Sequence, residues 1–184
     1  QAQKGAIKIV KQDGYTKQRL AGAEFKFRDT INNHTATFTA NRNGEVLIPG
    51  LAGDRVYEIT EIKAPDGYII DRRAHKVDLR GQGGKTYTLV LNNQAQKGAI
   101  KIIKQDVESK EPLAGAVFEW KDTTNDYTQR VTTGWDGTVT ISGLSVNRVY
   151  EIREVQAPAG YSRNTTPCGS NNCNCSRKPK NTGL

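Results

Sequence analysis

The sequence predicts an all-β fold of two tandem β-sandwich modules, and three observations lead to that prediction. A segment of 68 residues occurs twice at a constant offset of 93. Within each copy, apolar and polar residues alternate with period two in short runs bounded by Gly, Asn, Asp and Pro. No segment shows a sustained helical period. Several short strands in about 93 residues are typical of a two-sheet sandwich.

The internal repeat sets the domain organisation. Residues 1–13 return as residues 94–106 with a single replacement, and the alignment continues without a gap to Tyr68 and Tyr161. Of the 68 aligned positions, 38 are identical. We therefore divide the chain into a first module at residues 1–93, a second module at residues 94–161 and a tail at residues 162–184.

Five strands of the first module are predicted from the alternation and from the turn residues between the runs. Asn43 and Gly44, like Asp136 and Gly137 in the second copy, form a dipeptide typical of tight hairpin turns, because Gly adopts positive φ at little cost. The predicted strands are Gly5 to Lys11, Ala23 to Phe27, Val46 to Ile48, Arg55 to Glu61 and Lys85 to Asn93.

The charge distribution argues against a nucleic-acid partner. The net charge of +8 divides into +5 for residues 1–93, −1 for residues 94–161 and +4 for residues 162–184. A duplicated DNA-binding module should be basic in both copies. No run approaches the roughly 20 apolar residues that span a bilayer, so we expect no membrane span. The N-terminus carries neither an initiator Met nor a signal sequence, so we interpret the chain as a piece of a longer protein.

Three polar residues fall where the alternation predicts buried side chains. Lys11 follows Ile7 and Ile9 on one face of the first strand, and Glu61 and Asn93 end the apolar faces of the fourth and last predicted strands. An unpaired buried charge costs several kcal/mol. We therefore expect the three side chains to lie together.

Such a cluster is suited to one specific reaction. Burial favours the uncharged form of both ionisable groups, so a neutral amine would face a protonated carboxyl group. The Lys11 amine would then attack the side-chain carbonyl of Asn93, while Glu61 donates a proton and shuttles protons as ammonia leaves. Alternation alone equally allows a buried Lys11–Glu61 salt bridge beside Asn93, or strand ends that emerge into water.

Several motifs resemble those of a known family, the Cna-B (SpaA-like) domains. Residues 57–68 (YEITEIKAPDGY) and residues 150–161 (YEIREVQAPAGY) resemble the E-box of that family. The segments Leu20 to Phe25 and Leu113 to Phe118 also match, as do the Gly-Leu pairs before each E-box. The resemblance implies a transthyretin-like or immunoglobulin-like β-sandwich of the kind found in stalks of Gram-positive adhesins and in pilins.

The resemblance also implies a site and a role. In the family, a lysine of the first strand forms an isopeptide bond with an asparagine of the last strand, assisted by the E-box glutamate. These positions correspond to Lys11, Asn93 and Glu61, with Asn92 as the alternative acceptor.

The implied role is a self-stabilised stalk repeat of an extracellular, cell-wall-anchored protein, with neighbouring domains of that protein as its partners. Its chemistry would be a single self-modification without turnover, so we do not expect an enzyme. The alternative is a direct adhesin module that binds a host matrix protein such as collagen.

The second module departs from the family pattern. Lys104 and Glu154 occupy the positions that correspond to Lys11 and Glu61. The position that would correspond to Asn93 at the offset of 93 residues lies beyond the last residue of the chain. We therefore expect a module that lacks a recognisable last strand, with Asn181 as a remote candidate acceptor. A strand from another chain that completes the fold is the other interpretation. The polar tail, residues 162–184, is expected to be disordered.

No metal or cofactor is expected. Cys168, Cys173 and Cys175 have no histidine nearby and fall short of a usual zinc set. His34 and His75 have no Ser, Cys or acid at a recognisable catalytic spacing, so we interpret both as isolated surface or strand-edge residues.

Overall fold

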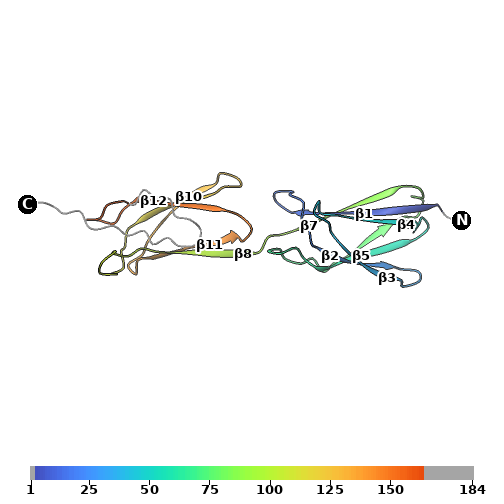
Figure 1. Cartoon of the computed structure of the whole chain (residues 1–184), viewed down its shortest axis with the longest axis horizontal. Coiled ribbons are helices and arrows are strands. Elements are labelled where there is room, and N and C mark those ends of the chain that lie inside the picture. The colour runs from blue at the N-terminus through green and yellow to red at the C-terminus, as the bar shows by residue number, and fades with distance from the viewer. Residues whose placement is uncertain (1–2, 164–184) are drawn as a thin grey trace, which may run out of the picture. The chain divides into compact units, whose positions relative to one another are not determined.

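A computed structural model describes residues 3–163 (Figure 1). These residues form twelve β-strands and no helix, which confirms the all-β prediction. Within this part of the chain no helix is long and apolar enough to cross a membrane. The contacts divide the chain into unit 1, Gln1–Gln96, and unit 2, which begins at Lys97.

Unit 1 is a two-sheet sandwich. Its first sheet has the strand order β4-β1-β7, with β1 antiparallel to β4 and parallel to β7. Its second sheet has the order β3-β2-β5-β6, in which all neighbours are antiparallel. The strands are β1 (Lys4–Asp13), β2 (Glu24–Asp29), β3 (Thr35–Thr39), β4 (Glu45–Ala52), β5 (Val56–Lys63), β6 (Ala74–Asp78) and β7 (Thr86–Asn93).

The core of unit 1 lies between the two sheets and is filled by every second residue of the central strands. Ile7 and Ile9 of β1 and Ile59 of β5 are fully buried. Phe27 stacks on Tyr57 with ring centroids 5.2 Å apart. Because side chains alternate between the faces of a strand, this core stripe leads directly into the polar residues at the strand ends.

Unit 2 repeats this plan with fewer strands among its described residues. Strands β11 and β8 form one sheet, and β10-β9-β12 form the other. Trp120 takes the place of Phe27 as a buried core aromatic. No counterparts of β6 and β7 occur between residues 97 and 163. The strands are β8 (Lys97–Ile103), β9 (Val117–Asp122), β10 (Thr128–Thr132), β11 (Thr138–Ser145) and β12 (Tyr150–Gln156).

The predictions for the end of the chain fall outside the described residues. They concern the missing last strand of the second module beyond residue 163, the acceptor Asn181, the disordered tail and the three cysteines. Among the described residues, no group of His, Cys, Asp and Glu side chains is arranged to hold a metal ion.

Two features of unit 1 differ from the sequence prediction. Strands β3 and β6 were not predicted, because both are short edge strands whose side chains are mostly polar or exposed. The turn at Asn43 and Gly44 exists, but it leads from β3 in one sheet to β4 in the other and does not close a two-stranded hairpin. A tight turn in the sequence therefore does not identify which strands pair.

Gly44 braces the backbone of β1 beside Lys11. Its φ is +70°, and its carbonyl oxygen accepts a hydrogen bond from Lys11 N at 2.7 Å. A Cβ atom at this position would meet Lys11 O at 2.7 Å. Only glycine fits both the left-handed backbone and the close approach.

The segment after β7 is held against the turn that precedes β6. Ala95 forms a β-bridge with Tyr68, and Ile69 N donates to Gln94 O at 2.9 Å. Gln96 N donates to Gly67 O at 2.8 Å. These bonds fix the C-terminal end of β7, where Asn93 lies.

Candidate functional site: a buried Lys–Glu–Asn cluster

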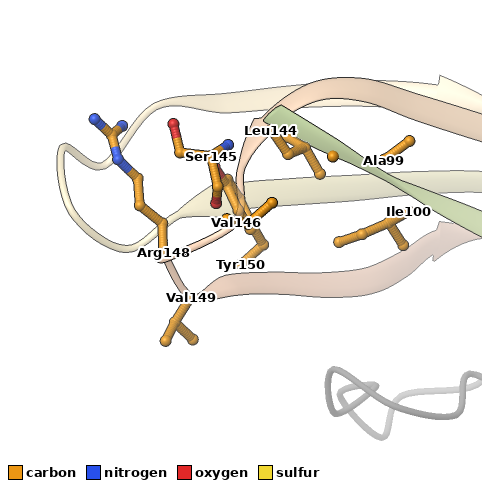
Figure 2. Close-up of a pocket in the computed structure, with 9 residues that line it drawn as sticks. Ala99, Ile100, Leu144, Ser145, Val146, Arg148, Val149 and Tyr150 are labelled. Carbon is orange, nitrogen blue, oxygen red and sulfur yellow. Dashed lines mark hydrogen bonds between the residues drawn. The ribbon is translucent and has the colours of Figure 1, made fainter. Parts of the chain in front are cut away.

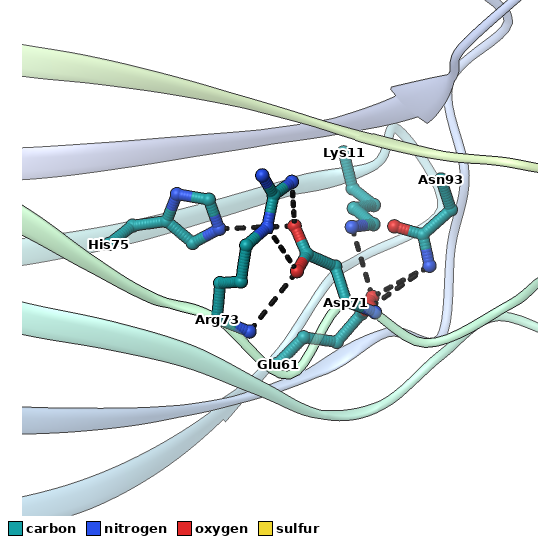
Figure 3. Close-up of polar contacts among 6 residues, drawn as sticks. All are labelled: Lys11, Glu61, Asp71, Arg73, His75 and Asn93. Carbon is teal, nitrogen blue, oxygen red and sulfur yellow. Dashed lines mark hydrogen bonds and ion pairs between the residues drawn. The ribbon is translucent and has the colours of Figure 1, made fainter.

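Three strands place Lys11, Glu61 and Asn93 at one end of the unit 1 core (Figure 3). Lys11 is in β1 and Asn93 is the last residue of β7 in the same sheet, while Glu61 reaches across from β5 in the opposite sheet. Lys11 pairs with Leu91 in the parallel β1–β7 register. Asn93 is two residues beyond Leu91 on the same face, and is therefore a diagonal neighbour of Lys11.

The three side chains are removed from water and contact one another through Glu61. The exposed fractions of Lys11, Glu61 and Asn93 are 0%, 2% and 2%. Lys11 Nζ lies 3.0 Å from Glu61 Oε1. Asn93 Nδ2 donates to Glu61 Oε1 at 3.1 Å and to Oε2 at 3.0 Å. Glu61 is thus placed between the amine and the amide.

The surroundings of Lys11 favour a neutral amine. Burial lowers the pKa of Lys11 from its usual value, and the contact with Glu61 offsets this only in part. The ring of the buried Phe25 lies under the amine, with its centroid 5.6 Å from Nζ. This ring helps to exclude water, although its face also attracts an ammonium group. A neutral amine has the free electron pair that a nucleophile needs.

Two polar atoms of the cluster lack ordinary hydrogen bonds. Lys11 Nζ is within ion-pair distance of Glu61 but outside hydrogen-bond geometry, and Asn93 Oδ1 has no donor among the described residues. Unsatisfied buried polar atoms are rare in native structures and often mark functional sites. Here the two atoms are the nucleophile and the oxygen of the electrophile in the reaction considered above.

Asn92 lies outside this cluster. Its side chain is exposed, and its Oδ1 accepts a hydrogen bond from Gln12 Nε2 at 3.0 Å. Because neighbouring residues of a strand point to opposite faces, Asn92 and Asn93 cannot both face Lys11 in this register.

Asp13 and Tyr68 hold β7, the strand that carries Asn93, in place. Neither residue was predicted from the sequence to be part of the site. Tyr68 Oη donates to Asp13 Oδ2 at 2.9 Å in the interior. The other carboxylate oxygen accepts hydrogen bonds from Thr16 N and Tyr15 N, each at 2.7 Å. Burial opposes ionisation, but these donors outweigh it and lower the pKa of Asp13. The turn so formed lets Gly14 N donate to Asn93 O at 2.9 Å.

The repeat itself carried a signal for this pair. Asp13 and Tyr68 have identical counterparts at Asp106 and Tyr161. The Tyr161 hydroxyl and Asp106 are hydrogen-bonded as well. Identity between two divergent copies at polar positions could therefore have pointed to this contact, which the alternation pattern does not reveal.

Unit 2 reproduces the first half of the site. Lys104 Nζ lies 2.9 Å from Glu154 Oε1, and the exposed fractions of the two residues are 2% and 4%. Lys104 N donates to Gly137 O at 2.8 Å, as Lys11 N does to Gly44 O. The same buried ion pair, on the same strands, occurs in both units.

A family profile covers both units. The profile of the SpaA prealbumin-like fold domain matches residues 5–95 and again residues 98–169, which together make up most of the chain. The chain belongs to this SpaA family. The resemblance noted in the E-boxes is thereby confirmed.

Relatives of this SpaA chain include one protein named as a surface protein and one named as a pilin. The Trypsin-resistant surface T6 protein of Streptococcus pyogenes serotype M6 is 44% identical over 62 residues, which are 34% of this chain and 11% of that protein. The Bacillus anthracis TIE protein has a TM-score of 0.63 at 27% identity, covering 90% of this chain and 30% of its own.

A Streptococcal ancillary pilin gives a TM-score of 0.45 at 23% identity and covers 96% of this chain and 62% of its own. The SpaA chain thus spans about a tenth of the T6 protein and about a third of the TIE protein.

One pocket distinguishes the second SpaA domain from the first. It has a volume of about 300 Å³ and lies between the start of β8 and the segment that joins β11 to β12 (Figure 2). In unit 1 the counterpart of Gly98 is Gly5, where a Cβ would meet Lys85 O at 3.0 Å and Leu79 at 3.7 Å. The fully buried Leu79 and the turn before β7 therefore fill this place in unit 1. We attribute the pocket to the lack of counterparts to Leu79 and this turn among residues 97–163, and not to a ligand site.

Proposed function

We propose that unit 1 forms an intramolecular isopeptide bond between Lys11 Nζ and the side-chain carbonyl carbon of Asn93, with Glu61 as the proton shuttle. The observation that carries this proposal is the buried cluster itself. A lysine amine with a lowered pKa, a carboxylate at 3.0 Å and an amide at 3.0–3.1 Å from that carboxylate occupy one buried site. Such pre-positioning supplies the effective concentration that a reaction at a stable amide needs.

The reaction balances without an external reactant. Glu61 takes a proton from the Lys11 ammonium group, which leaves a neutral amine. The amine attacks the Asn93 carbonyl carbon while Glu61 donates its proton to the carbonyl oxygen. Glu61 then carries a proton from the attacking nitrogen to Asn93 Nδ2. The C–N bond breaks, ammonia leaves, and the carbonyl oxygen returns its proton to Glu61, which ends protonated. The net change is one new amide bond and the loss of one ammonia.

The bond would join the first and last strands of the unit. Residues 1–163 contain no cysteine, so no disulfide stabilises either described sandwich. A covalent link between β1 and β7 restricts the unfolded chain in the way that a disulfide does. The reaction occurs once and consumes its own groups, so the proposed chemistry is a self-modification and not enzymatic turnover.

The biological role that we propose is a structural repeat of an extracellular, cell-wall-anchored protein of a Gram-positive bacterium. The membership in the SpaA family and the name of the Trypsin-resistant surface T6 protein support this role. Its partners would be neighbouring domains of the same protein. The direct adhesin remains a hypothesis, since no observation among the described residues favours it.

The intact mass of the purified chain tests the proposed bond. We expect a mass about 17 Da below the sequence mass, because one ammonia leaves when an amine displaces an amide. The deficit should be absent in Lys11→Ala and present in Lys104→Ala, which makes the matched change in unit 2. An unshifted wild-type mass would reduce the cluster to a buried salt bridge with a hydrogen-bonded amide.

A further inference from the structure

The loop between β5 and β6 folds back onto the reactive cluster. Asp71 lies in this loop, and its backbone N–H donates to Glu61 Oε2 at 2.8 Å. The same oxygen accepts from Asn93 Nδ2, while Oε1 is the oxygen 3.0 Å from Lys11 Nζ. The Asp71 N–H thus orients the carboxylate with one oxygen toward the amine (Figure 3).

The side chain of Asp71 holds the loop in this position. Arg73 donates to it through Nε and Nη2, each at 2.8 Å, and through its backbone N at 3.1 Å. His75 Nε2 lies 3.3 Å from Asp71 Oδ2. The interpretation of His75 as an isolated residue is therefore wrong. The Arg73 guanidinium holds the pKa of Asp71 far below its usual range, so the carboxylate stays ionised.

The contact with His75 connects the loop to the sheet. His75 is in β6 and pairs with Ile59 of β5, two residues before Glu61. The side chain of Asp71 is therefore tied to the sheet that carries Glu61, and its main chain is tied to the carboxylate of Glu61. Without these contacts the terminal torsion of Glu61, which has no sharp rotamer preference, would be less restricted.

We propose that Asp71, fixed by Arg73 and His75, is a positioning residue that orients the Glu61 carboxylate for proton transfer between Lys11 and Asn93. This inference rests on the proposed isopeptide bond and adds a residue outside the reacting three. Asp71 does not touch Lys11 or Asn93 through any hydrogen bond, so its positioning effect acts through Glu61, and only its charge acts on Lys11 directly.

The chain contains a matched control for this proposal. Asp78 and Arg80 form the same two-residue arrangement, with Arg80 Nε and Nη2 at 2.9 and 2.7 Å and Arg80 N at 3.0 Å from the Asp78 carboxylate. Arg80 likewise lowers the pKa of Asp78, to about 2. The Asp78 side chain has no contact with Glu61, so its loss tests the general cost of removing such a pair.

The experiment follows bond formation in newly synthesised chain. Wild type, Asp71→Ala, Arg73→Ala and Asp78→Ala are made by cell-free translation at low temperature, quenched in acid at intervals and weighed by intact-mass spectrometry. We expect Asp71→Ala to form the bond about 10- to 100-fold more slowly, because small displacements of a positioned group have effects of this size. Arg73→Ala should also be slower, and Asp78→Ala should match wild type.

The pH dependence of the rate separates the positioning effect of Asp71 from the effect of its charge on Lys11. The reaction uses a proton that Lys11 supplies, so we expect the rate to fall at high pH, where the Lys11 ammonium group has lost its proton to the solvent. The charged groups that face Lys11 are Glu61 and Asp71, and both raise its pKa against the effect of burial. Asp71→Ala should therefore move the alkaline limb to lower pH, whereas Arg73→Ala, which keeps the Asp71 charge, should not.

The outcomes distinguish this inference from the proposed function. If the wild-type chain reacts and Asp71→Ala reacts as fast as Asp78→Ala, the positioning role is wrong and the bond stands. If the wild-type chain never loses ammonia, the proposed function fails and this inference fails with it. Should Asp71→Ala not fold, Arg73→Ala decides the question, because the Arg73 side chain is 82% exposed and its removal leaves the core intact.

Discussion

Replacing Glu61 with Gln is expected to lower the midpoint of thermal unfolding of unit 1 by roughly 20–35 °C. The variant keeps the shape of the side chain but removes the proton shuttle, so the bond does not form. A link between residues 11 and 93 closes a loop of about 80 residues, and the chain-entropy estimate for such a loop is about 4–5 kcal/mol. In a domain of this size each kcal/mol shifts the midpoint by about 4–8 °C.

Differential scanning calorimetry of the full chain measures this effect. Glu154→Gln makes the same substitution in the buried ion pair of unit 2 and leaves the unit 1 bond intact. We expect the unfolding transition of unit 1 to lie at high temperature in the wild-type chain. This transition should move to lower temperature in Glu61→Gln and stay in place in Glu154→Gln. A shift of less than about 5 °C in Glu61→Gln would mean that the cluster contributes no covalent link.

The resistance of unit 1 to mechanical force is the second large effect. The chain enters the sandwich at Lys4 in β1 and leaves it at Asn93 in the neighbouring parallel strand β7. A Lys11–Asn93 bond would carry the load directly between these strands. The residues between the two bonded positions, about 80 in number, would then be shielded from extension.

Single-molecule stretching of the chain by its two ends would show this shielding. At about 3.3–3.6 Å per residue, unfolding of the shielded segment releases roughly 260–290 Å. We expect this extension step in Glu61→Gln and not in wild type, while any step that arises from unit 2 appears in both. An extension step of that length in the wild-type chain would contradict the proposed mechanical role of the bond.

The alternation of apolar and polar residues predicted both the strands that carry the cluster and the positions of its three residues. It succeeded for β1, β5 and β7 because their core-facing residues continue without interruption into Lys11, Glu61 and Asn93. It was less informative at the start of β7, where Tyr87 is 41% exposed. This strand lies at the edge of its sheet, so the alternating pattern there does not guarantee burial.

Turns and loops carried less information than strands. Asp71 lies in an irregular loop, and its contact with Glu61 is made by a main-chain N–H, which every residue except proline possesses. No side-chain pattern in a single sequence predicts such a bond. The two copies also lose their similarity after Tyr161, so the repeat provided no second example of Asp71.

The most direct test of the central claim is the sequence of the cross-linked peptide. After proteolysis of the wild-type chain, tandem mass spectrometry should identify a branched peptide in which the Lys11 side chain is joined to Asn93, with the loss of one ammonia. A branch at Asn92 would contradict the register of β7, in which Asn92 faces away from the cluster. Recovery of only linear peptides containing free Lys11 and free Asn93 would contradict the account as a whole.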